Sequence, residues 1–195
     1  MTLTHLIFGN EFNQPVRNLP PSITHLGFGF SFDQPISNLP TSITHITFSY
    51  DFNQSLNTLP LSLTHLNIFS YNFTSSLNSL PSNLLCLKVR AQYFNQPLNH
   101  LPNKLTLLEL SSPYFNHNLN CLPDSITHLH LNCCQLKHKI TKLPASITYV
   151  EFSSSRRSFI GTMPSVSLLI LGVRDFAGIN LSELPLQLTE ALTNS

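Results

Sequence analysis

Short apolar runs of one fixed pattern recur along the chain, and most follow a Leu-Pro pair. Within a run, apolar residues stand at the first, fourth and sixth positions, as at Ile23, Leu26 and Phe28. The end of each run alternates apolar and other residues, which is typical of a strand that buries one face, because successive side chains point to opposite sides. The pattern therefore predicts one short, half-buried strand per run. The same spacing occurs at Ile43, Ile46 and Phe48, at Leu105, Leu108 and Leu110, and at Ile126, Leu129 and Leu131.

The runs belong to a repeat that organises the chain from residue 1 to 185. The prolines that close the units follow one another at 20 or 21 residues, with Met163-Pro164 in place of one Leu-Pro pair. We expect an array of about nine coils, followed by a C-terminal tail or short helical cap over residues 186–195. The closing prolines are Pro20, Pro40, Pro60, Pro81, Pro102, Pro123, Pro144, Pro164 and Pro185.

A coil with one strand cannot bury both of its flat sides alone, so the coils must stack on one another. We predict a repeat solenoid, a leucine-rich-repeat-like right-handed superhelix with one parallel β-sheet on its concave face. The remainder of each unit is short and rich in proline, which disfavours a helix and favours an irregular, turn-rich convex side. A parallel β-helix is the alternative fold.

An aromatic residue lies eight residues before the closing proline in each of the first six units. We expect these rings to point inward and to stack between coils as a structural spine, each buried ring contributing about 1.5–3 kcal/mol. The Asn that usually follows, or Asp33 in the second unit, is expected to bond backbone groups at the bend. The spine residues are Phe12, Phe32, Phe52, Phe73, Phe94 and Phe115.

The composition restricts the classes of function. Charged residues make up 10% of the chain and the formal net charge is +1, so bulk electrostatics favours neither nucleic acid nor an anionic membrane as a partner. No apolar run approaches the roughly 18 residues that span a bilayer, and the N-terminus lacks the pattern of a signal peptide. The four cysteines show no disulfide framework, which fits a reducing compartment. We therefore expect a cytoplasmic protein with protein partners.

A histidine occupies the same strand position in the first four units, at His5, His25, His45 and His65, and again at His128. Its neighbours in the strand point inward, so the imidazoles are expected to form a row on the concave face, about 4.8 Å apart. A linear row does not converge on a tetrahedral centre, so we expect stacked, solvent-facing rings and no metal or cofactor. Mutual repulsion is expected to lower the pKa of these histidines and to loosen the first coils in mild acid.

Departures from the repeat on the concave face are the places where specificity is expected. The outward positions of the first three units hold mostly small residues, whereas those of units four to eight carry bulk and charge. We predict a protein-binding surface there, formed by Phe69, Lys88, Arg90, Glu109, His130, Tyr149 and Glu151.

A second departure is the stretch LKHKITKLP, residues 136–144, which stands where other units have FNQPLxxLP. Nine of the ten Lys and Arg residues lie from Lys88 onward. One interpretation is a solvated rim, and the other is a basic edge that docks an acidic segment of a partner. The predicted basic edge comprises Lys137, Lys139, Lys142, Arg156 and Arg157.

The unit LPxSITHLxFxxxFNQPLxxLP resembles the FNIP repeat, a leucine-rich-repeat-like family, over nearly the whole chain. The resemblance implies a protein of amoebae or of the large viruses that infect them, located in the host cytoplasm if it is viral. Such repeats often follow an F-box, which implies a substrate-recruiting adaptor of a ubiquitin ligase. Here the first strand is expected at Leu3 to Phe8, directly after Met1, so we expect no F-box and only the recognition half of that role.

These observations favour a non-enzymatic protein–protein interaction module, which the resemblance extends to a substrate receptor linked in trans to a ubiquitin ligase. No acid pair, nucleophile–base set or phosphate loop indicates an enzyme. The alternative is a structural or self-associating repeat protein. The array begins with Leu3, Leu6, Phe8 and Phe12 and no polar cap, so self-association through this N-terminal coil is part of that alternative.

Overall fold

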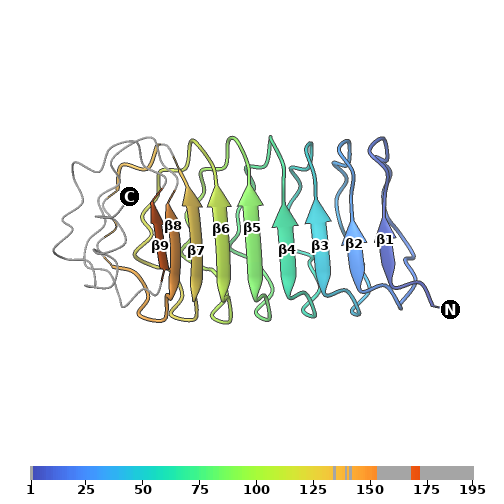
Figure 1. The fold of residues 1–195 in the computed structure, drawn as a ribbon. Coiled ribbons are helices and arrows are strands. Elements are labelled where there is room, and N and C mark those ends of the chain that lie inside the picture. Colours follow the sequence, from blue (N-terminus) through green and yellow to red (C-terminus); the bar gives the residue numbers. More distant parts are fainter. Residues whose placement is uncertain (1, 134, 139, 141, 153–167, 172–195) are drawn as a thin grey trace.

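A computed structural model describes residues 2–133, 135–138, 140, 142–152 and 168–171. In these residues nine strands form one sheet, whose spatial order is the order of the strands in the sequence (Figure 1). The strands are β1 His5–Ile7, β2 His25–Gly27, β3 His45–Phe48, β4 His65–Ile68, β5 Cys86–Arg90, β6 Leu107–Ser111, β7 His128–Asn132, β8 Tyr149–Phe152 and β9 Leu168–Leu171.

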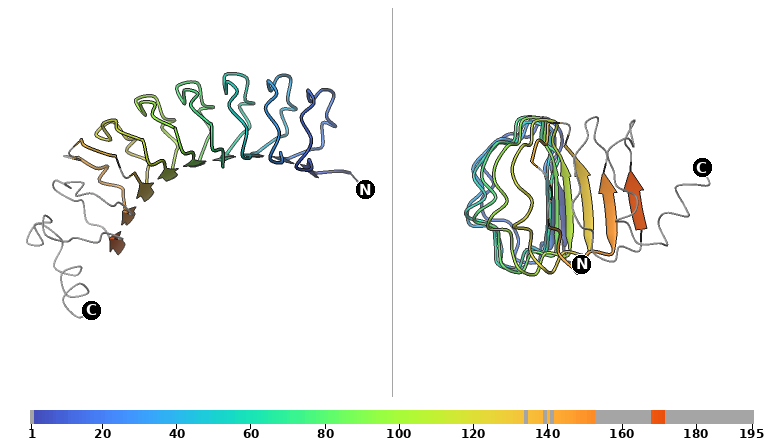
Figure 2. Two further views of the ribbon diagram at one scale, coloured as in Figure 1. Left: turned by 90° about the horizontal axis from the view of Figure 1, so that it is seen from above. Right: turned by 90° about the vertical axis from the view of Figure 1, so that its left-hand side faces the viewer.

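Every pairing in the sheet is parallel, and equivalent positions of successive coils lie side by side. Leu6 pairs with Leu26, and Leu26 pairs with Ile46. The coils form an arc with the strands on its inner side (Figure 2), and the chain winds in a right-handed sense. The predicted leucine-rich-repeat-like solenoid with a concave parallel sheet is therefore confirmed. A parallel β-helix would carry more than one strand per coil, and the described part of the chain has one.

The interior is a continuous apolar column in which aromatic rings of successive coils stack. The centroids of Phe32 and Phe52 lie 6.3 Å apart with the rings 4° from parallel, and those of Phe94 and Phe115 lie 6.2 Å apart at 2°. Four of the six spine rings therefore pack between the rings of two neighbouring coils, namely Phe32, Phe52, Phe73 and Phe94. Phe12 is partly buried, and the fully buried rings are Phe32, Phe52, Phe73, Phe94 and Phe115.

The polar residues of the repeated Ser-Ile-Thr-His segment join each coil to the one before it. Ser42 Oγ donates to the carbonyl of Ile23 over 2.6 Å, and Thr44 Oγ1 donates to the carbonyl of Thr24 over 3.2 Å. These bonds explain why the polar positions recur as regularly as the apolar ones. Equivalent bonds are made by Ser22, Ser62, Ser125 and Ser146, and by Thr24, Thr64, Thr127 and Thr148.

The Asn or Asp that follows the spine ring makes a second set of links between coils. Asn13 Oδ1 accepts a hydrogen bond from the backbone N–H of Asp33 over 3.0 Å, and Asp33 Oδ1 accepts one from Asn53 over 2.9 Å. Asn53 Oδ1 in turn accepts one from Thr74 over 2.9 Å. These side chains reach the next coil instead of closing a bond within their own turn, so the turn residues also hold the stack together.

Outside the strands, the described residues contain no helix, as predicted for an irregular convex side. Asn18 and Asn38 have a backbone φ of 56°, in the left-handed region that Asn tolerates better than most residues. No helix in the described residues is long and apolar enough to cross a membrane. The predicted tail or cap, residues 186–195, lies outside the described residues.

Candidate binding surface on the concave sheet

The register of the sheet determines which side chains share a row on the concave face. His5 pairs with His25, His25 with His45, and His45 with His65. The row continues through Cys86, Leu107, His128 and Tyr149. The adjacent outward row consists of Ile7, Gly27, Thr47, Asn67, Lys88, Glu109, His130 and Glu151.

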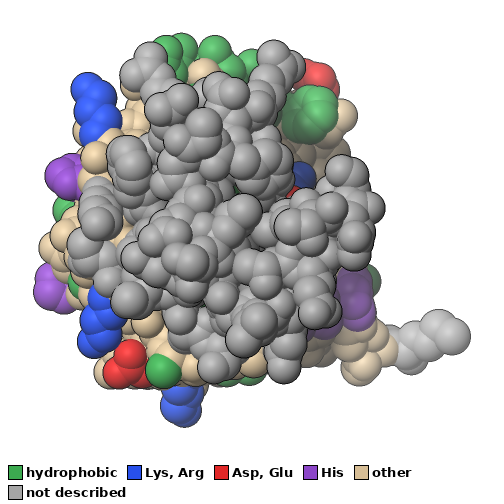
Figure 3. All heavy atoms as spheres, turned by 60° about the vertical axis from the view of Figure 1, so that its left-hand side comes forward, with side chains coloured by type: hydrophobic (Ala, Val, Ile, Leu, Met, Phe, Trp, Pro, Cys, Tyr) green, Lys and Arg blue, Asp and Glu red, His purple; other side chains and the backbone are tan. Residues whose placement is uncertain are grey.

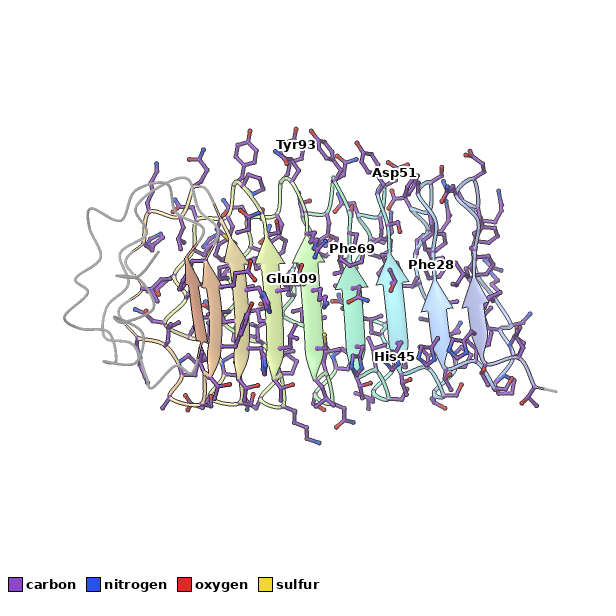
Figure 4. The ribbon with its side chains drawn as sticks, viewed as in Figure 1. Phe28, His45, Asp51, Phe69, Tyr93 and Glu109 are labelled. Atoms are coloured by element: carbon purple, nitrogen blue, oxygen red, sulfur yellow. The ribbon has the colours of Figure 1, made fainter. Side chains whose placement is uncertain are left out.

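The four imidazoles of the first coils form one stack, as the row was expected to do. Their successive ring centroids lie 4.1 Å apart, with interplanar angles between 9° and 13°. His45 lies near the lower end of its strand in Figure 4. Rings at this distance make extensive dispersion contacts, and each ring covers part of its neighbour.

The threonine before each histidine of the row holds the imidazole ring in place. Thr24 Oγ1 lies 2.9 Å from His25 Nδ1 and 3.2 Å from the carbonyl oxygen of Thr4. The hydroxyl therefore holds the imidazole ring at its Nδ1 side. Thr44 and Thr64 make the same two contacts.

The stacked geometry of the histidine row does not suit a metal centre. Nearly parallel rings place their Nε2 atoms side by side, whereas tetrahedral zinc requires ligands that converge on one point. Within the described ranges, no group of three or more His, Cys, Asp or Glu side chains is placed to hold a metal ion. The geometry favours a row that supports the surface of the sheet.

Protonation is unfavourable in the middle of the histidine row. The pKa of His45 is lowered from its ordinary value of 6.5, first by burial and then by the charges of His65, His25 and His5. The pKa of His25 is also lowered, again first by burial and then by the charges of His5 and His65. Burial is therefore the largest single cause of the lowering, ahead of the charge of each neighbouring histidine.

We expect the first four coils to lose stability as the pH falls below about 6.5, because the unfolded chain then binds protons that the folded stack resists. The stabilisation is complete above the pKa of unfolded histidine and is lost between that value and the lowered folded value. Amide hydrogen exchange in β1 to β4 tests this expected loss of stability. It is measured from about pH 7.5 to about pH 5, a range in which most carboxylates stay ionised. The double variant His25→Gln/His45→Gln should reduce the pH dependence, and an unchanged dependence would contradict the stated cause.

Coils four to six bring an aromatic ring, two cations and a carboxylate together on the concave face (Figure 4). The guanidinium carbon of Arg90 lies 5.3 Å from the centre of the Phe69 ring, and Arg90 Nε donates to Glu109 Oε1. Lys88 Nζ lies 3.6 Å from Glu109 Oε2. Arg90 is therefore held by a cation–π contact on one side and an ion pair on the other.

The next two coils hold a second group of interacting side chains. His130 Nδ1 lies 2.8 Å from Glu151 Oε2, and the Tyr149 hydroxyl donates to the same oxygen over 3.2 Å. The Tyr149 ring stacks on His128 with centroids 5.7 Å apart and lies 4.8 Å from the His130 ring. The pKa of Tyr149 is raised, first by burial and then by its hydrogen bond to Glu151.

The concave face is hollowed between these two groups. The hollow has a volume of about 470 Å³ and is lined by residues of β5 to β8. Arg90 and Glu109 of the first group and His130 and Glu151 of the second contribute to its lining. The structure thus brings the seven predicted concave residues into two neighbouring groups on either side of one hollow. We call these seven residues the concave patch: Phe69, Lys88, Arg90, Glu109, His130, Tyr149 and Glu151.

The predicted basic edge is described only in part. Lys137 and Lys142 are exposed, and their backbone N–H groups donate to Asn116 Oδ1 and Asn120 Oδ1 of the preceding coil. Figure 3 shows Lys and Arg side chains at separate places around the outline of this end of the molecule. The basic edge stays a prediction. Its members outside the described residues are Lys139, Arg156 and Arg157.

A row of exposed aromatic rings, not evident from the repeat pattern, runs along the edge of the solenoid. Neighbouring ring centroids lie 5.3–6.3 Å apart, and the Tyr71 and Tyr93 hydroxyl oxygens lie 3.4 Å apart. Figure 4 places Tyr93 beyond the arrowheads of the strands, whereas Glu109 lies over the sheet. We call this row the aromatic ridge. It consists of Phe30, Tyr50, Tyr71, Tyr93 and Tyr114, which are 41–59% exposed.

The sequence does contain a signal for the ridge. An aromatic residue precedes the spine phenylalanine in five consecutive units. Its offset is two residues up to Tyr71 and one residue from Tyr93 onward, so a search for a strict period misses it. The contacts within the concave patch have no such signal, because they depend on side-chain conformations across two coils.

A right-handed solenoid with one parallel strand per coil defines a leucine-rich-repeat-like protein. The sequence profile described as FNIP Repeat matches residues 1–31, 16–51, 32–71, 94–134 and 115–155. The chain therefore belongs to the FNIP repeat family.

One solved structure with a similar fold is the crystal structure of CroV588, described as a novel circular LRR protein structure. The two chains share 38% sequence identity and superpose with a TM-score of 0.73. The match covers 87% of this chain and 27% of that chain, so this chain spans about a quarter of the length of its structural relative. A comparison with curated proteins finds no match.

Proposed function

We propose that this chain is a non-enzymatic protein-interaction module whose concave patch binds a protein partner. The observation that carries the proposal is the gathering of the seven patch side chains on either side of a hollow of about 470 Å³. In the same outward row the first two coils hold Ile7 and Gly27, and the third holds Thr47. Side chains that could contact a partner specifically are therefore concentrated in β5 to β8.

Internal contacts hold the patch residues in place before a partner arrives. Arg90 packs on Phe69 and donates to Glu109, and Tyr149 contacts both His128 and His130 while its hydroxyl donates to Glu151. Side chains that are already ordered lose less conformational entropy on binding. Arg and Tyr are also residue types that commonly dominate the binding energy of an interface. The arrangement therefore supports a preformed binding surface.

The charges of the patch indicate the chemistry of a complementary partner. Lys88 and Arg90 share the carboxylate of Glu109, so this side of the hollow retains a net positive charge. On the other side, Glu151 carries a formal negative charge. A partner surface with an acidic group above β5 and a basic group above β8 would match both sides.

A narrower form of the proposal is that the chain presents a captured protein to a separate ubiquitin ligase. Membership of the FNIP repeat family is its support, through the resemblance to repeats that follow an F-box. Comparing the ubiquitination of the captured protein in cells with and without this chain tests the narrower form. An unchanged level of ubiquitin on the captured protein would contradict the narrower form, but it would not contradict the proposed binding.

Affinity purification with quantitative mass spectrometry from the native cell tests partner binding. The baits are the wild-type chain, Arg90→Glu, Tyr149→Ala and the matched control Arg17→Glu, which makes the same charge change at an exposed residue of the first coil. Proteins bound through the concave patch should be retained by wild type and Arg17→Glu. Arg90→Glu and Tyr149→Ala should each lose them.

Titration calorimetry with the recovered protein then gives the size of the effect. We expect Arg90→Glu to weaken binding at least about tenfold, because it removes a central arginine and places a carboxylate beside Glu109. Circular dichroism checks that the variant remains folded. A partner that binds wild type and Arg90→Glu with equal affinity would show that the concave patch is not its binding site.

A further inference from the structure

The aromatic ridge is an extended apolar surface that the described part of the chain leaves uncovered. Its five rings remain 41–59% exposed although each contacts its neighbour. Single exposed apolar side chains are common, whereas a continuous row of them indicates an interaction surface. Asp51 is the one charged residue next to a ridge residue in the sequence. The ridge therefore requires a partner surface that is apolar and close to neutral.

The area of the ridge is close to the lower limit for a specific protein contact. Full burial of an aromatic side chain removes about 150–250 Å² from water, so a half-exposed ring still offers about 100 Å². Five such rings offer about 500 Å², and two ridges in contact would bury about 1,000 Å², the size at which specific interfaces begin. Interfaces at this lower limit are typical of weak, transient complexes, so we expect association in the micromolar range or weaker.

The spacing of the rings limits which partner can touch all five. Neighbouring rings repeat at 5.3–6.3 Å. Side chains on one face of a strand repeat at about 6.7 Å, and those on one side of a polyproline helix repeat at about 9.3 Å. Both therefore fall out of step with the ridge along its length. A second copy of this chain carries the same spacing.

An α-helix also has a matching period, with a pitch of about 5.4 Å, but its chemistry fits less well. Four of the five ridge residues are tyrosines, and each hydroxyl can both donate and accept a hydrogen bond. The apolar stripe of a helix would leave these hydroxyls without partners. A second row of tyrosines supplies both donors and acceptors, so the ridge is complementary to itself.

The shape of the solenoid permits contact along the whole ridge. The coils form an arc (Figure 2). Tyr93 lies beyond the strand ends (Figure 4), and the contacts between neighbouring rings continue the ridge from coil to coil. A two-fold axis along a radius of the arc, through the middle of the ridge, superimposes two ridges with opposite chain directions. Tyr71, the third of five rings, then meets Tyr71 of the second copy. Tyr50 meets Tyr93, and Phe30 meets Tyr114.

We propose that the aromatic ridge is a self-association surface through which two copies of this chain form an antiparallel two-fold dimer. The formal net charge of +1 produces little repulsion between copies. The concave patch lies on the sheet and the ridge lies at its edge (Figure 4), so the dimer leaves both concave faces open. The dimer does not depend on the proposed partner binding.

Charge substitutions at Tyr71 test the dimer at its two-fold axis. Tyr71→Glu alone and Tyr71→Lys alone each place like charges opposite one another, which should weaken association at least about tenfold. An equimolar mixture places Glu opposite Lys and should recover association. Sedimentation velocity across the micromolar to millimolar range measures all three samples and the wild type.

Tyrosine fluorescence supplies a second measurement that reports on the ridge itself. Four of the five tyrosines belong to the ridge and the chain has no tryptophan. The emission of the wild type should change with protein concentration, and that of Tyr71→Glu should not. Leu61→Glu is the matched control, because Leu61 is 70% exposed and lies outside the ridge, and it should associate like the wild type.

Three results would overturn the proposed dimer. The first is a wild-type chain that remains monomeric across the whole concentration range. The second is a Glu–Lys mixture that associates no better than either variant alone, which would indicate a different partner such as an apolar helix. The third is an equal loss of association in Leu61→Glu. Arg90→Glu should leave the dimer intact, so failure of the dimer and failure of concave binding are distinguishable.

Discussion

Phe73→Ala is expected to lower the free energy of unfolding by about 3–5 kcal/mol. Phe73 is completely buried, and its ring centroid lies 6.2 Å from that of Phe52 and 5.9 Å from that of Phe94. Truncation removes the contacts with both neighbours and leaves a cavity, because a close-packed interior relaxes only in part. Since each coil contacts only adjacent coils, the cavity also weakens the coupling between the two halves of the array.

Urea denaturation followed by circular dichroism measures the effect of Phe73→Ala. The unfolding transition should move to lower urea and broaden as the two halves unfold less cooperatively. Phe30→Ala is the matched control, because it removes the same atoms from a ring that is 59% exposed. We expect the control to change the free energy of unfolding by less than about 1 kcal/mol. Equal losses in the two variants would contradict the role given to the spine.

Gly29→Ala is expected to destabilise the contact between the first two coils by about 1–3 kcal/mol. A Cβ atom at Gly29 would lie 2.4 Å from the carbonyl oxygen of Gly9 and 2.6 Å from the Cα of Asn10. Both atoms belong to the backbone, so they cannot rotate away and the coils must move apart. The backbone of Gly29 does not have a positive φ, so the cause is lack of space rather than an unusual conformation.

Gly9→Ala is the control for this prediction, because a Cβ atom there has no neighbour within 4 Å. Both substitutions remove the same conformational freedom from the unfolded chain, so the difference between them reports the steric contact. Amide hydrogen exchange in β1 and β2 measures the local effect. Protection should fall in Gly29→Ala and persist in Gly9→Ala, and a similar change in both would contradict the steric explanation.

The architecture could be predicted from the sequence because every unit repeats the apolar spacing that forms a half-buried strand. Ile23, Leu26 and Phe28 stand at the spacing that buries one face of a short strand, and the same spacing in later units puts every strand in register. A fixed period also places equivalent side chains side by side, which is why the histidine row and the phenylalanine spine could be expected. These features depend on backbone position alone.

The remaining features depend on contacts that the period does not determine. The bond from Arg90 to Glu109 and that from His130 to Glu151 each join two coils through side chains whose conformations are chosen in three dimensions. The sequence indicated that these residues face outward but not that they pair. The requirement for glycine at position 29 could not be predicted either. It comes from a close approach of backbone atoms, and every residue has these atoms whatever its side chain.

Coils one to three make the same contacts from one unit to the next, so they are interchangeable building blocks. Without residues 21–40, Ser42 would reach the carbonyl of Leu3 and His45 would stack on His5, as Ser22 and His25 do now. Coils five to eight are not interchangeable, because Glu109 pairs with cations of the coil before it and Glu151 pairs with a histidine of the coil before it. The number of N-terminal coils can therefore change in whole steps and alter the reach of the molecule, while the order of the later coils must be preserved to keep the concave patch.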